Sequence, residues 1–219
     1  MTGRRPKDSL TAATTSLLLP ALEPLGFRKK SSRVIGRIRS DILQFLDLQV
    51  SSFGSKDFCV NYASVSLFLP REFLVLQPGG RLRNAGGAEA WWPASSHDIA
   101  IASMQEVVRA FQNQATPFFT STETVEGLLG FLLTEDWASQ HHLKFELGCY
   151  LAILGKIEEA ERHLTQAISF YRADGRKWCQ DYITKCEELI AAIRRGVASE
   201  LFQEWTRQSV RGLRLEKLA

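Results

Sequence analysis

The chain has 219 residues, of which 45% are hydrophobic, so it can bury one large core or two smaller ones. Its 27 basic and 24 acidic residues give a net charge of +3, which neither requires nor excludes a polyanionic partner. The four cysteines show no CxxC pair and no zinc-finger spacing, so we expect reduced thiols and no zinc site. No run approaches the roughly 18 apolar residues that a membrane span needs, and we expect no membrane association.

The N-terminus superficially resembles a secretion signal, because Arg4, Arg5 and Lys7 precede an apolar stretch. However, Asp8 interrupts the junction, threonine and serine dilute the apolar run, and no small-residue cleavage site follows. We therefore expect a cytoplasmic protein.

The first predicted helix spans residues 8–25, where leucine and alanine recur at helical spacing. Pro24 and Gly26 are typical of a helix end. The next segment, residues 27–39, contains no acidic residue and is predicted to be an edge strand, on which basic side chains discourage sheet-to-sheet aggregation. The alternative is a nucleic-acid-binding patch, although the interleaved aromatic residues that stack on bases are missing. The basic residues of this segment are Arg28, Lys29, Lys30, Arg33, Arg37 and Arg39.

Residues 41–61 are predicted to form the two central strands of a small sheet, joined by a turn at Phe53-Gly54-Ser55. Asp47 lies among apolar neighbours, so its carboxylate must be paired or lie at an edge, and we expect a cross-strand ion pair with Arg33 or Arg37. A line of polar residues along these strands could also face a groove for a peptide or a small ligand. Its members are Gln44, Asp47, Gln49 and Asn61.

A glycine-rich segment, residues 77–93, lacks the glycine spacings of phosphate-binding loops. It contains Arg81 and Arg83 and ends in the adjacent tryptophans Trp91 and Trp92, of which one should face the core and the other should face outward. We favour packing as the role of the pair. An exposed tryptophan beside Arg81 or Arg83 would instead indicate an interaction surface.

From residue 96 onward the sequence predicts helices. The first spans residues 96–114 and is closed by Pro117, a short one follows at 122–132, and later ones lie near 175–193 and 201–205. Between them, residues 137–171, beginning at Trp137, have the small-residue spacing of a single tetratricopeptide repeat. The residues that carry this spacing are Leu147, Gly148, Gly155, Ala160 and Ala167. We expect the basic tail after residue 206 to be solvated.

Several short blocks together resemble one uncharacterised bacterial family, the domain of unknown function 4304. They are LGFRKK at residues 25–30, residues 41–61, RLR at 81–83, WWP at 91–93 and TPFF at 116–119. The resemblance covers residues 17–133. It implies the fold of the family and no activity, because the family has none from which a residue's role could be transferred.

The sequence gives little support for a metal-binding or catalytic site. His142 and Glu146 have the i, i+4 spacing of metal ligands, and His163 could approach them, but a third ligand is missing and we expect no metal site. Cys149 lies about two helical turns from His142, too far for a nucleophile and base pair. We therefore assign no catalytic, cofactor-binding or metal-binding residue and expect a protein that is not an enzyme.

The predicted fold class is α+β, with a small antiparallel sheet flanked by helices over residues 1–120. An all-helical, tetratricopeptide-like extension over residues 121–219 is expected to pack on it. We expect a protein-interaction module of the adaptor or immunity type that binds a protein partner. Nucleic-acid binding through the basic segment is the alternative, and a hydrolase or transferase that uses Asp47 and Arg33 is a weaker one. The candidate interaction surface comprises Arg28, Lys29, Lys30, Arg33, Arg37, Arg39, Asp47, Arg81, Arg83, Trp91 and Trp92.

Overall fold

The structure is a computed structural model that describes residues 8–53, 55–134 and 139–218. Arg4, Arg5, Lys7, Gly54 and Trp137, all used in the sequence-based predictions, lie outside the described residues. Within the described part, no helix combines the length and the apolar character that crossing a membrane requires.

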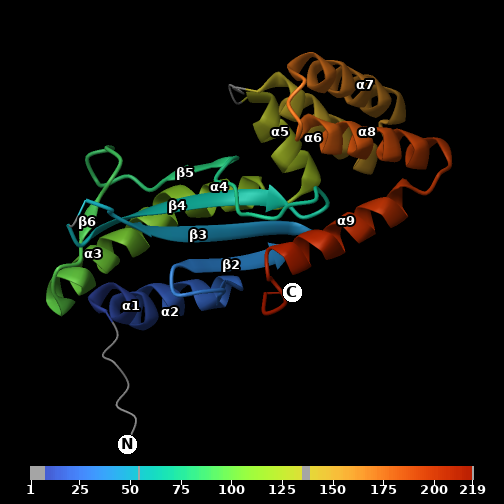
Figure 1. The fold of residues 1–219 in the computed structure, drawn as a ribbon. Helices are drawn as coiled ribbons and strands as arrows, with labels where there is room; N and C mark the ends of the chain where they lie inside the picture. The colour runs from blue at the N-terminus through green and yellow to red at the C-terminus, as the bar shows by residue number, and fades with distance from the viewer. Residues whose placement is uncertain (1–7, 54, 135–138, 219) are drawn as a thin grey trace, which may run out of the picture. The chain divides into compact units, whose positions relative to one another are not determined.

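The described chain forms two compact units (Figure 1). The first contains an antiparallel sheet with helices and comprises residues 8–65, 75–121 and 215–218. The second is helical and comprises residues 66–74 and 122–214. The α+β class is thus confirmed. Compared with the predicted domains, 1–120 and 121–219, residues 66–74 belong to the helical unit and residues 215–218 to the first unit. The packing of the helical extension on the first domain stays a prediction.

The sheet of the first unit has the strand order β1-β2-β3-β4-β5, and β6 also pairs with β4. The predicted edge strand over residues 27–39 is in fact two strands, because the side chain of Ser31 accepts hydrogen bonds from the backbone of Arg33 and Val34 and closes a turn between them. Ser40 and Asp41 both adopt positive φ, as a two-residue hairpin between β2 and β3 requires. The strands are β1 (Arg28–Lys29), β2 (Val34–Arg39), β3 (Ile42–Val50), β4 (Asp57–Ser66), β5 (Gly79–Arg81) and β6 (Trp92–Pro93).

Two helical segments of this unit each contain a π-helical turn, and each turn is followed two residues later by a proline, Pro20 or Pro117. A proline has no N–H to donate and its ring clashes with the carbonyl four residues earlier, so a wider turn relieves the clash. The predicted end of the second helix at Pro117 is therefore wrong, and the helix continues to Ser121. The first segment is α1 (Ser9–Ala13), η1 (Thr14–Leu18), α2 (Leu19–Leu22) and the 3₁₀ turn η2 (Glu23–Leu25); the second is α3 (His97–Ala110), η3 (Phe111–Ala115) and α4 (Thr116–Ser121).

One face of the sheet packs against these helices. Leu46 and Leu48 of β3 and Phe58 and Val60 of β4 share one hydrophobic core with residues of α1 to α4. Phe27, which follows the first helical segment, contacts the rings of Phe111 and Phe119 in the same core. Because side chains alternate along a strand, the intervening residues of β3 and β4 point to the other face.

The second unit contains five helices within its described residues, and Gly155, Gly175 and Gly196 adopt positive φ at three of the helix ends. Helices α6 and α7 pack closely, since a Cβ at Gly148 would lie 2.6 Å from Cγ of Leu164. The close approach predicted at Gly148 is thus confirmed, while the tetratricopeptide class stays a prediction. The helices are α5 (Val125–Thr134), α6 (Gln140–Ile153), α7 (Ile157–Asp174), α8 (Cys179–Arg194) and α9 (Ala198–Gly212).

The C-terminal tail differs from its prediction. Leu213 and Leu215 are buried, and a Cβ at Gly36 of β2 would lie 3.3 Å from Cδ1 of Leu218. The expectation of a solvated tail is therefore wrong, because leucines alternate with the basic residues that suggested it.

Candidate functional site

A polar cluster lies on the face of the sheet that points away from α1 to α4. Asp47 and Gln49 of β3 alternate with core leucines, and Cys59 and Asn61 of β4 alternate with core residues in the same way. Arg81 of β5 is the cross-strand neighbour of Asn61. We call the group the sheet-face cluster; its members are Asp47, Gln49, Cys59, Asn61, Arg81, Glu89 and Trp91.

Asn61 connects the cluster. Its Nδ2 donates to Oε1 of Gln49 over 3.4 Å, and its Oδ1 accepts from Nε of Arg81 over 3.2 Å. A hydrogen bond between its side chain and the Asp47 carboxylate favours the charged form of that carboxylate. One buried amide thus links residues from three strands.

Arg81 and Trp91 form the outer part of the cluster. The Arg81 guanidinium lies over the Trp91 ring, 5.5 Å from the ring centroid. The guanidinium also forms an ion pair of 3.3 Å with Glu89. Trp91 is 45% exposed, whereas Trp92 is buried, packs against Phe58 and donates to Glu106 over 3.2 Å. The prediction that one tryptophan faces the core and the other faces outward is therefore confirmed.

Burial shapes the electrostatics of this face. Desolvation raises the pKa of the half-buried Asp47, and the hydrogen bond with Asn61 opposes that rise. The pKa of the Cys59 thiol is also raised by burial, although Arg81 opposes the shift, so this cysteine is not an activated nucleophile. Asp47 forms no ion pair with any residue that the structure describes.

The predicted ion pair between Asp47 and Arg33 or Arg37 is wrong. Arg33 pairs with Asp8 at 3.4 Å, and Arg37 donates from Nε to Gln44 over 2.8 Å. The reason is strand alternation: Arg37 and Gln44 are cross-strand neighbours on the helix-covered face, whereas Asp47 points to the other one. The residues of the proposed hydrolase or transferase site are thus not brought together.

The candidate interaction surface predicted from sequence is divided by the fold. Asp47, Arg81 and Trp91 come together in the sheet-face cluster. Arg28 and Lys29 lie exposed on β1. The backbone N–H of Arg83 donates to Oε1 of Gln114, and the Arg83 carbonyl accepts from Nε2 of the same side chain. Lys30 and Arg39 flank the hairpin turns, and Trp92 is in the core.

The candidate interaction surface predicted from the sequence lacked several members of the sheet-face cluster, which the pairing of neighbouring strands brings together. Gln49 and Asn61 were recognisable as part of a polar line, although Gln44 of that line lies on the other face, where its Nε2 donates to the Phe119 carbonyl over 2.6 Å. No sequence pattern indicates that Glu89 belongs to the cluster. The antiparallel bridge between Arg83 and Glu89 brings it there.

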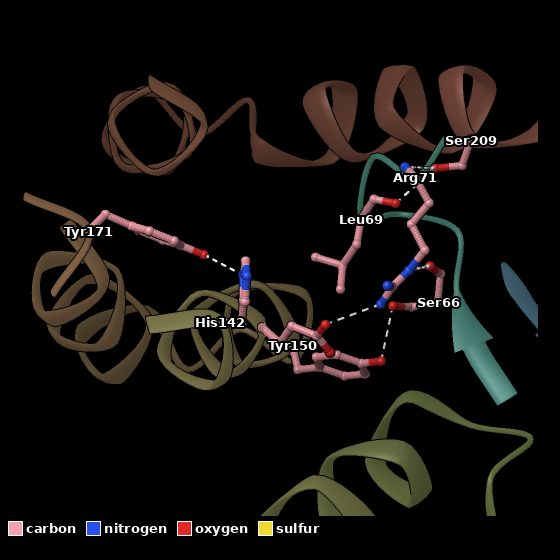
Figure 2. A network of polar contacts seen from close by, with 8 residues as sticks. Ser66, Leu69, Arg71, His142, Tyr150, Tyr171 and Ser209 are labelled. Atoms are coloured by element: carbon pink, nitrogen blue, oxygen red, sulfur yellow. Dashed lines mark hydrogen bonds and ion pairs between the residues drawn. The ribbon is translucent and has the colours of Figure 1, made fainter. Parts of the chain in front are cut away.

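The helical unit contains a second polar network, which fixes residues 66–74 (Figure 2). Arg71 pairs with Glu146 of α6 at 3.2 Å. The hydroxyl of Ser209 in α9 donates to the Leu69 carbonyl over 2.8 Å and accepts from the Arg71 backbone N–H over 3.1 Å. Tyr150 donates to the hydroxyl of Ser66 over 3.0 Å. The two contacts of Ser209 satisfy backbone groups of Leu69 and Arg71, and the other two join side chains of residues 66–74 to α6, so the network has a structural role.

His142 belongs to an aromatic cluster in the same unit. Its ring stacks on Trp178. Its Nδ1 forms a hydrogen bond of 2.8 Å with the hydroxyl of Tyr171 (Figure 2). Burial, followed by the nearby His141 and Arg176, lowers the pKa of His142 to about 4. The metal site considered for His142 and Glu146 is not assembled, because Tyr171 and Arg71 engage these two residues. Over the described residues, no group of three potential metal ligands occurs.

The protein is of the α+β class. Helices cover one face of its small antiparallel sheet, the sheet-face cluster lies on the other face, and a helical unit is also present. Residues 18–121 match the model of the domain of unknown function DUF4304. The resemblance predicted from short sequence blocks is confirmed over this range. Searches among curated proteins and among solved structures gave no match.

Proposed function

We propose that the protein is a non-enzymatic interaction module, of the adaptor or immunity type, that binds a protein partner through the sheet-face cluster. The observation that carries the proposal is the pair formed by the exposed Trp91 and the Arg81 guanidinium above its ring. Tryptophan and arginine are the residues most enriched among those that contribute most to protein–protein binding.

The cluster is also preorganised. Asn61 and Glu89 hold the Arg81 side chain in place before any partner arrives. Ordering a long side chain opposes association, so an arginine that is already fixed loses less entropy on binding. Its remaining N–H groups and the exposed part of Trp91 would provide a polar and an apolar contact side by side.

We also propose that the protein acts in the cytoplasm. Its four cysteines are all free and buried, which suits a reducing compartment.

The experiment is affinity capture from a lysate of the native cells, with the wild-type chain compared with Trp91→Ala. We expect a protein that binds the wild type in stoichiometric amount at high salt and is lost with Trp91→Ala. Phe53→Ala is the matched control, because Phe53 is 95% exposed and lies in the turn between β3 and β4, outside the cluster. Capture of the same proteins by wild type and Trp91→Ala would contradict the proposal.

The same eluates test nucleic-acid binding through Arg28, Lys29 and Lys30. Nucleic acid that is captured at low salt and released at high salt would replace the proposal with this alternative. Substitution of Lys29 and Lys30 by glutamate should then abolish capture, while Trp91→Ala should leave it unchanged.

A further inference from the structure

We infer that the protein partner presents an arginine side chain, whose guanidinium binds Asp47 and Gln49 in the sheet-face cluster. The inference rests on the proposed function and specifies the chemistry of the partner.

The first observation is that the Asp47 carboxylate lacks a counter-ion. It is half-buried, its bonding partner is the neutral amide of Asn61, and no cation among the described residues pairs with it. A partly desolvated carboxylate is stabilised by a nearby cation. The missing cation is therefore the group that a partner can supply with the largest gain.

The second observation is that acceptors dominate this part of the cluster. Among the described residues, the contacts to Oε1 of Gln49 are one of 3.4 Å from Asn61 and one of 3.9 Å from Sγ of Cys59, both long for hydrogen bonds. It can therefore accept a stronger donor. Asp47 and Gln49 are two residues apart on β3, so their side chains share one face about 7 Å apart at the backbone.

This spacing favours arginine over lysine. A guanidinium carries five N–H donors in one plane and can bond two acceptors at once, whereas an ammonium is a compact point charge. The local charge also favours a cation, since Glu89 and Arg81 neutralise each other and leave the charge of Asp47 uncompensated. A carboxylate from a partner would be repelled by Asp47.

The test is an NMR titration of the full-length chain, labelled with nitrogen-15, with N-acetyl-arginine methylamide as the probe. We expect saturable shifts of the Asn61 and Gln49 side-chain amides. N-acetyl-lysine methylamide should bind more weakly, and N-acetyl-glutamate methylamide should cause no saturable shift. Equal responses to the arginine and glutamate probes, or no saturable shift with arginine, would overturn the inference.

Two variants locate the site. Asp47→Asn should weaken arginine binding by about tenfold or more, the order expected for loss of a charge-assisted contact worth about 1.5 kcal/mol. Asp57→Asn, on β4 but outside the cluster, should have no effect. Gln49→Met should reduce the preference for arginine over lysine, and it keeps the test decisive if Asp47→Asn alters the fold. Unchanged arginine binding in both cluster variants would overturn the inference.

The outcomes separate the inference from the proposed function. If Trp91→Ala loses the captured protein while the arginine probe does not bind, the interaction surface stands and the arginine assignment is wrong. If Trp91→Ala retains the captured protein but the probe binds in an Asp47-dependent way, the proposed partner surface fails and a guanidinium site remains.

Discussion

Arg71 and Glu146 form an ion pair in which each side chain is only 12% exposed. Burial raises the pKa of Glu146, and the Arg71 charge and hydrogen bond oppose that rise. Oε2 of Glu146 is buried and has no hydrogen-bond partner among the described residues, so the carboxylate depends on Arg71 for its stabilisation. Removing one partner of such a pair leaves a buried charge without compensation.

We expect Arg71→Met to lower the free energy of unfolding by about 3 kcal/mol, at the lower end of the range for a broken buried pair. The measurement is urea denaturation followed by far-ultraviolet circular dichroism. Arg172→Met is the matched control, since Arg172 and Glu187 form a pair whose side chains are 65% and 53% exposed. Exposed pairs contribute little, so equal losses in the two variants would contradict this account.

The neutral His142 makes stability depend on pH. Its pKa falls from an ordinary value of 6.5 to about 4 in the folded protein, so the unfolded chain binds more protons between these values. Its contribution to stability is complete above pH 6.5 and is lost as pH falls toward 4. Protonation would also place a cation beside Arg176.

We expect His142→Gln to flatten the decline in stability between pH 6.5 and 4, measured by urea denaturation across that range. His97→Gln, at the exposed start of α3, is the control and should keep the wild-type slope. A wild-type slope in His142→Gln would show that another group controls the acid response.

At the scale of elements, helix packing depends on where a small residue is required. Gly148 faces α7, where an added Cβ would lie 2.6 Å from Cγ of Leu164 and 3.3 Å from the Ala160 carbonyl. Gly130, in the interior of α5, is exposed and has no atom within 4 Å of an added Cβ. Substitution by alanine should therefore have opposite effects on stability at the two glycines.

We expect Gly148→Ala to destabilise the protein by about 1–3 kcal/mol, because Leu164 must move in a packed interface. Gly130→Ala should stabilise it by about 0.5–1 kcal/mol, because alanine restricts the unfolded chain and favours the helix. Thermal unfolding of both variants measures the difference. A stabilising Gly148→Ala would mean that α6 and α7 are not in close contact at this point.

At the scale of the whole molecule, the chain passes between its two units more than once. Residues 66–74 leave the end of β4 and belong to the helical unit, although they lie inside the segment that matches the DUF4304 family. Phe68 of this segment contacts the rings of Tyr150 and Phe202, and the Arg71 carbonyl lies 3.0 Å from the position of a Cβ at Gly212. The helical unit is therefore incomplete without a segment from the other half of the sequence.

We expect a fragment of residues 122–214 to melt at a lower temperature and less cooperatively than the same helices in the full chain, as measured by circular dichroism. A synthetic peptide of residues 66–74 added to the fragment should raise the melting temperature. The same peptide with Arg71 replaced by alanine should do so less. A fragment as stable as the full chain would show that the segment is dispensable for this unit.

Local patterns were sufficient to predict most of the elements. The apolar spacing predicted the helices over residues 8–25 and 175–193, and the alternating pattern of residues 41–61 predicted the two central strands, β3 and β4. The outward orientation of one of the two adjacent tryptophans follows from strand alternation alone. Neither the extension of a helix past Pro117 nor the split of residues 27–39 into two strands was predicted, because π-helical turns and side-chain-closed turns have weak local signals.

The sequence by itself determined the fold class, the helical character of the C-terminal half and the presence of polar residues on the central strands, because these follow from periodicities of two or 3.6 residues. Only the tertiary structure decided which residues meet. Arg71 and Glu146 are 75 residues apart, and Asn61 and Arg81 are 20 residues apart. Asp47 bonds Asn61 rather than an arginine because the helices cover the face on which Arg37 lies, and that choice of face depends on how the whole chain closes around its core.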